Sequence, residues 1–88
     1  MAMATALKHS ITVEGGVVQE ANFNTYPLVR TNESPAINIV LIKSTEKPGG
    51  IGEPFMAATV PSLANAVANL TGKRIRTLPL TGKMIQEA

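Results

Sequence analysis

The segment Pro48–Pro54 carries the residues best suited to chemistry in this sequence. Glycines occupy positions 49, 50 and 52, and Glu53 follows directly. Glycine has no Cβ, so backbone N–H groups in such a segment can approach a bound ligand closely. A carboxylate projected beside the loop is suited to act as a general base next to a cofactor. On the residues alone, a solvated turn between two elements is the commoner role of such a segment.

Composition excludes several other kinds of site. The 88 residues include no Cys, no Asp and one His, and the net charge is +2. A thiolate metal site, a multi-histidine metal site and a self-contained Ser-His-Asp triad are therefore impossible within this chain. No apolar run approaches the roughly 20 residues of a membrane span. No broad basic face predicts nucleic-acid binding, and a chain this short leaves little room for an enclosed pocket.

The first third of the chain predicts a helix followed by a β-hairpin. Residues 1–8 have helix-forming composition. Ile11–Val13 has the pattern of a strand, Glu14–Gly16 supplies turn residues, and Val17–Glu20 can return as the partner strand. We therefore expect two short antiparallel strands after the first helix.

A loop rich in Asn and Pro is expected over residues 21–35. Arg30 lies close to Glu33, and a charge-assisted hydrogen bond from this arginine would fix the loop. His9 lies at the junction between the first helix and the first strand. A capping or surface role is more common for such a lone histidine than a role in proton transfer.

The second half of the chain predicts one long strand, a loop and one helix. Residues 36–43 have the strongest strand pattern, and both faces of this strand are apolar. A strand of this kind is normally covered on both faces, which a chain of 88 residues struggles to do. A helix is predicted over residues 60–71, with Pro61 in its first turn and Gly72 ending it. Residues 81–88 have too little apolar content to place, so we treat them as a candidate disordered tail.

These elements predict a small single domain of α+β class. A hairpin and one long central strand would pack with one or two helices. A stand-alone domain would cover the apolar strand itself or by dimerising, whereas a segment of a larger protein would expose it.

Four sequence blocks add a more specific signal. They read NFNTYPLVRTNESP at 22–35, PGGIGEP at 48–54, PSLANAV at 61–67 and TGKRIRTLP at 71–79. In this order and spacing they resemble the C-terminal segment of the molybdopterin-binding catalytic subunits of the xanthine dehydrogenase and aldehyde oxidase family. The isoquinoline 1-oxidoreductase-like subunits are the most similar branch, and the resemblance covers nearly the whole chain.

The resemblance implies hydroxylation of an aromatic N-heterocycle or an aldehyde, with water supplying the oxygen. Glu53 matches the general base of the family, and Gly50, Ile51 and Gly52 match the backbone that lies against the molybdenum–pterin cofactor. The intact enzyme is expected to hold molybdopterin in a dinucleotide form. Its [2Fe–2S] clusters would lie on a partner subunit or domain, because this chain has no Cys to hold them.

The same resemblance implies that the isolated chain binds no cofactor and is inactive. Its partners would be the remainder of the molybdopterin-binding subunit and an iron–sulfur subunit, in the periplasm or the cytoplasm of a bacterium. Phe55 and Met56 depart from the family, which often has a small residue there. These two residues would line the substrate pocket or merely pack. The alternative interpretation of the whole chain is a small stand-alone interaction domain without catalysis.

Overall fold

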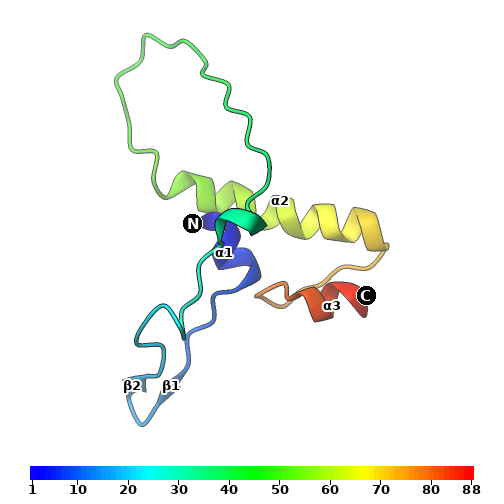
Figure 1. The fold of residues 1–88 in the computed structure, drawn as a ribbon. Helices are drawn as coiled ribbons and strands as arrows, with labels where there is room; N and C mark the ends of the chain where they lie inside the picture. Colours follow the sequence, from blue (N-terminus) through cyan, green and yellow to red (C-terminus); the bar gives the residue numbers. More distant parts are fainter.

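Three helices and one short β-hairpin form the regular structure of residues 1–88 in the computed structural model (Figure 1). In chain order the elements are α1 (Ala2–Leu7), β1 (Val13–Glu14), β2 (Val17–Val18), the 3-10 turn η1 (Thr31–Glu33), α2 (Pro54–Thr71) and α3 (Gly82–Gln86). The predicted α+β class and the predicted first helix are confirmed. None of the helices combines the length and the apolar character that crossing a membrane requires.

Helix α2 is the longest element and begins directly after Glu53. Pro54 suits its first turn, because the N–H that proline lacks would have no partner there. At the other end, Gly72 adopts a φ of 76°, and its N–H donates to the carbonyl of Ala68 at 2.8 Å. The predicted end at Gly72 is confirmed, but the predicted start near residue 60 is wrong. The helix continues through Pro61, although an interior proline removes one backbone hydrogen bond and crowds the carbonyl one turn earlier.

The predicted β-hairpin is confirmed, with shorter strands than the sequence pattern indicated. Val13 lies opposite Val18, and the two residues of the turn are Gly15 and Gly16. Their φ angles are 57° and 78°. A tight two-residue hairpin turn needs positive φ at both positions, which glycine adopts without strain.

The core is small and lies where α1 crosses α2 (Figure 1). Only four of the 88 residues are buried, namely Ala4, Ala6, Val67 and Leu80. The N–H of Leu80 donates to the carbonyl of Ala6 at 2.7 Å, which joins the segment before α3 to α1. Small side chains on α1 allow the two helices to approach closely, and Leu80 closes the contact from the side.

The molecule exposes far more surface than a compact domain of its size. Its accessible surface is 7527 Å², against about 5,000 Å² expected for a folded monomer of this mass. The radius of gyration is 15.9 Å, against about 12 Å for a compact domain of this length. The difference comes from the hairpin and from the wide loop at residues 34–53, which project from the helices in different directions (Figure 1).

The long central strand predicted over residues 36–43 is absent from the chain. Residues 36–43 form no strand, and the one sheet of the chain contains only β1 and β2. A strand needs a partner for its backbone groups, and the hairpin strands pair with each other instead. The apolar pattern of residues 36–43 therefore does not by itself produce a strand in this chain.

Within residues 81–88, which the sequence pattern left without a predicted element, the structure has the short helix α3. Thr81 precedes the helix, and its side-chain oxygen accepts a hydrogen bond from the N–H of Met84 at 3.3 Å. This is ordinary N-terminal capping, and it compensates for the low apolar content of the segment.

Candidate functional site

Glu53 lies between the wide loop and helix α2. It is the residue that precedes the helix, and its carbonyl accepts a hydrogen bond from the N–H of Met56 at 2.9 Å. Its side chain is exposed and forms no hydrogen bond or ion pair within the chain. The arrangement leaves Glu53 available to a group outside the chain.

The glycine loop and the glutamate share one open hollow. Gly50, Gly52, Glu53 and Pro54 line this hollow, whose volume is about 440 Å³. The structure therefore brings together two of the predicted cofactor-binding glycines and the predicted base. Ile51 lies between the two glycines and is 74% exposed, but it does not line the hollow.

No packing within the chain requires glycine in this loop. A Cβ added at Gly49, Gly50 or Gly52 would meet no atom within 4 Å, and none of the three has a positive φ. The backbone N–H groups of residues 49–53 also have no acceptor in the chain. A close approach from outside would explain both features, because it would use the missing side chains and the free N–H groups together.

Phe55 and Met56 lie in the first turn of α2 and do not line the hollow beside Glu53. Phe55 is 62% exposed, so nothing in this chain packs over most of its ring. Met56 is half-buried. Their assignment to a substrate pocket stays a prediction.

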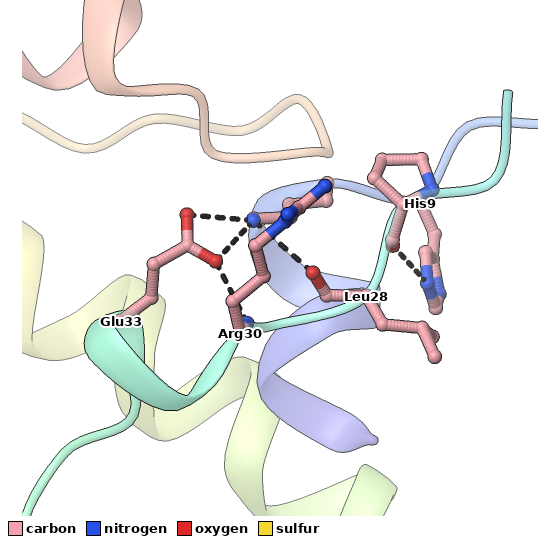
Figure 2. Close-up of polar contacts among 6 residues, drawn as sticks. His9, Leu28, Arg30 and Glu33 are labelled. Atoms are coloured by element: carbon pink, nitrogen blue, oxygen red, sulfur yellow. Dashed lines mark hydrogen bonds and ion pairs between the residues drawn. The ribbon is translucent and has the colours of Figure 1, made fainter. Parts of the chain in front are cut away.

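An ion pair fixes the start of the wide loop to α1 (Figure 2). Lys8 Nζ lies 2.6 Å from one carboxylate oxygen of Glu33 and also donates to the carbonyl of Leu28 at 3.3 Å. The same carboxylate accepts the backbone N–H of Arg30 at 2.8 Å. The hydrogen bond from Lys8 is the main cause that lowers the pKa of Glu33, and the Arg30 N–H lowers it further.

The expected charge-assisted hydrogen bond between Arg30 and Glu33 is present, but the donor is the backbone N–H of Arg30 and not its side chain. The charged partner of Glu33 is Lys8. Lys8 and Glu33 lie 25 residues apart, so no local spacing in the sequence could have identified the pair.

His9 holds residues 26 and 27, which precede these contacts, against the end of α1. Its ring stacks on Tyr26 with 3.9 Å between the ring centroids. Nε2 of the same ring lies 3.0 Å from the carbonyl of Pro27 (Figure 2). Nδ1 lies 3.3 Å from the hydroxyl of Thr5. Both ring nitrogens are thus occupied by structural contacts, which favours the structural role over proton transfer.

The residues beside Glu53 fit one wall of a cofactor site rather than a complete one. The chain offers a free carboxylate and free N–H groups on an open surface. No three His, Asp or Glu side chains gather closely enough to hold a metal ion. Any metal–pterin group would therefore be held mainly by ligands from outside the chain and contacted here by backbone groups.

Three curated proteins are similar to this chain over most of its length. The beta subunit of isoquinoline 1-oxidoreductase from Brevundimonas diminuta is 31% identical over 96% of the chain and 11% of its own length. The membrane-bound aldehyde dehydrogenase [pyrroloquinoline-quinone] of Gluconacetobacter polyoxogenes is 33% identical over 89% of the chain and 10% of its own length. A subunit of nicotinate dehydrogenase from Pseudomonas putida is 31% identical over 93% of the chain and 7% of its own length.

These relatives define one class, that of oxidoreductases built from long polypeptides. Their similarity over most of the chain agrees with the resemblance that the four sequence blocks carry. The chain spans about a tenth of the length of the relatives it matches. No protein-family model matches the chain, and no solved structure is significantly similar to it.

Proposed function

We propose that this chain is a segment of the catalytic subunit of a molybdenum-dependent oxidoreductase. The enzyme would hydroxylate aromatic N-heterocycles or aldehydes, with Glu53 as the general base and water as the source of oxygen. The observation that carries the proposal is the position of Glu53, whose unpaired carboxylate follows a glycine loop with free N–H groups. The names of two relatives refer to isoquinoline and nicotinate, and the third refers to an aldehyde, which supports this substrate range.

In the proposed reaction, a C–H bond of the substrate becomes C–O, and two protons and two electrons are released. Glu53 would accept one of these protons, because a carboxylate at an exposed helix start can hold and release a proton within reach of a bound substrate. The N–H groups of residues 50–52 would donate hydrogen bonds to the cofactor. When bound, a molybdenum–pterin group would supply the two-electron redox chemistry.

The other walls of the site would come from the remainder of the subunit. The hollow beside Glu53 is open, and four residues line it in this chain. A separate iron–sulfur subunit or domain would carry the electrons away, because the chain has no Cys. The isolated chain is therefore expected to be inactive.

Substitution of the proposed base tests this function. In the protein purified from its source, Glu53→Gln should lower kcat by about 10²- to 10⁴-fold, because the amide cannot accept the proton. Molybdenum content and circular dichroism should stay unchanged. Glu46→Gln, in the same exposed loop, is the matched control and should retain full activity. Turnover near the wild-type rate in the Glu53 variant would overturn the proposal.

Cofactor analysis of the same preparation tests the other half of the proposal. The name of one relative includes pyrroloquinoline quinone, so molybdenum and quinone must both be measured. Molybdenum in stoichiometric amount, in a subunit far larger than 9.3 kDa, is expected. Quinone without molybdenum, or a free 9.3 kDa chain, would contradict the assignment and favour the alternative of a small interaction domain.

A further inference from the structure

Residues 37–42, which we call the apolar segment, expose nearly all of their apolar side chains. The exposed fractions are 71% for Ile37, 78% for Ile39, 86% for Val40, 89% for Leu41 and 89% for Ile42. In an extended chain, the odd-numbered residues lie on one face and the even-numbered ones on the other. Both faces are therefore apolar, with Asn38 as the single polar residue. A folded protein does not leave such a surface in water without a partner.

The backbone of the apolar segment is as unpartnered as its side chains. No N–H or C=O group of residues 35–43 forms a hydrogen bond within the chain. The segment lies in the wide loop, away from the helices and the hairpin (Figure 1). If these residues formed a strand, the backbone groups along both of its edges would be free to pair. The side chains on both of its faces would be free to pack.

We infer that the apolar segment inserts as an interior strand between two strands of a sheet supplied by the remainder of the oxidoreductase subunit. An edge strand, or a strand with one face in water, would alternate between apolar and polar residues, and this segment does not. Backbone groups removed from water need partners, and an interior position provides them on both edges. This inference rests on the proposed function, because it names the remainder of the same subunit as the partner.

A second copy of the chain fits these features less well. Two apolar segments that pair with each other would satisfy one backbone edge of each strand and leave the other edge free. The relatives also show how much protein accompanies this sequence. They match it over 7–11% of their own length, so about nine-tenths of each such polypeptide lies outside the matched part. That remainder is large enough to supply a sheet with apolar layers on both sides.

Insertion would also position the candidate site. A strand of this length spans about 20 Å, and residues 43–52, which have no regular structure, connect its end to Glu53. The ion pair between Lys8 and Glu33 holds the start of the loop to α1, and α2 holds its end. Docking the strand would therefore fix the glycine loop at the end of a sheet strand rather than leave it in solvent.

Hydrogen exchange resolved to single amides tests the inference on the protein purified from its source. Neighbouring residues of an interior strand donate to opposite sides, so all amides at 37–42 should exchange at least about 100-fold more slowly than in the isolated 88-residue chain. Protection of alternate amides only would indicate an edge strand and overturn the inference. Absence of protection would overturn it as well. Protection in the isolated chain, together with dimerisation, would assign the segment to a second copy and also contradict it.

A matched pair of variants tests the two faces separately. Ile39→Lys and Val40→Lys place a charge on opposite faces of the strand. Both should lower the yield of assembled subunit and speed amide exchange at 37–42, whereas Thr45→Lys, in the same exposed loop, should change neither. A lower yield of assembled subunit in only one of the two variants would show that one face of the strand is in water. That result would overturn the interior position. The exchange measurement on the unmodified protein stays informative if a variant fails to fold.

The inference and the proposed function can fail independently. Protected amides in a protein without molybdenum, or with an active Glu53→Gln variant, would refute the function and keep the strand insertion. Unprotected amide hydrogen exchange at residues 37–42 in an active molybdenum enzyme would refute the strand insertion and leave the proposed function intact.

Discussion

At the scale of single residues, Glu33 joins two parts of the chain that are distant in sequence. Its carboxylate accepts hydrogen bonds from Lys8 and from the backbone N–H of Arg30, which together lower its pKa below the ordinary value of 4.5. Hydrogen bonds from the N–H and hydroxyl of Thr12 lower the pKa of Glu20 in the same way. A carboxylate with a lowered pKa stabilises the fold above its ordinary pKa, and this contribution is lost as the pH falls through its lowered value.

The 88-residue chain should therefore lose stability as the pH falls below 4.5, and Lys8→Met should make this loss shallower. The variant removes the main cause of the shift, so the pKa of Glu33 should rise towards its ordinary value. Carbon NMR titration of the Glu33 carboxyl, with thermal unfolding at each pH, measures both effects. Lys47→Met, in the wide loop, is the control and should leave the titration of Glu33 unchanged. An unchanged Glu33 titration in the Lys8 variant would refute the ion pair.

Sequence spacing can show that residues lie close together only where they are adjacent in the chain, and the roles assigned to Glu53 and its neighbours stay predictions. Glu53, Gly50 and Gly52 lie within four positions, so local order alone brings them to one hollow. The ion pair between Lys8 and Glu33 depends on the path of the intervening chain, and sequence spacing contains no information about that path.

At the scale of elements, Gly72 determines where α2 ends. Its φ of 76° is in the left-handed region, so Gly72→Ala should destabilise the chain by about 1 kcal/mol. Chemical unfolding followed by circular dichroism measures the change. Gly82→Ala is the matched control, because Gly82 begins α3 without a positive φ and has open space around it. Equal effects of the two substitutions would contradict the role of the left-handed conformation.

The elements that local chemistry determines were predicted correctly, and those that depend on partners were not. The hairpin follows from the turn at Gly15 and Gly16, and the end of α2 follows from Gly72. The start of α2 was misplaced because Pro54 and Pro61 both suit a first turn, and sequence cannot choose between them. The strand at residues 36–43 was predicted from a real pattern, but no partner strand exists in this chain.

At the scale of the whole molecule, the small core and the large surface predict how the isolated chain behaves. It should bind a hydrophobic dye such as ANS strongly, because the apolar segment is exposed. The double variant Ile39→Asn and Leu41→Asn should reduce the dye fluorescence, because it removes two of the five exposed apolar side chains of that segment. Its helical circular dichroism should stay the same, since neither side chain packs on a helix. Unchanged fluorescence, or loss of helix, would contradict the structure.

The exposure of residues 37–42 also has a consequence for synthesis and assembly. Six uncharged residues with high β-propensity and free backbone edges are a template for amyloid-like pairing between molecules. The sequence places Pro35 on one side of them and Lys43 on the other, and proline and lysine are the residues that block the growth of such stacks. These two flanking residues slow aggregation without preventing the segment from entering its own sheet. Until that sheet covers the segment, correct insertion competes with precipitation as the protein folds in the cell.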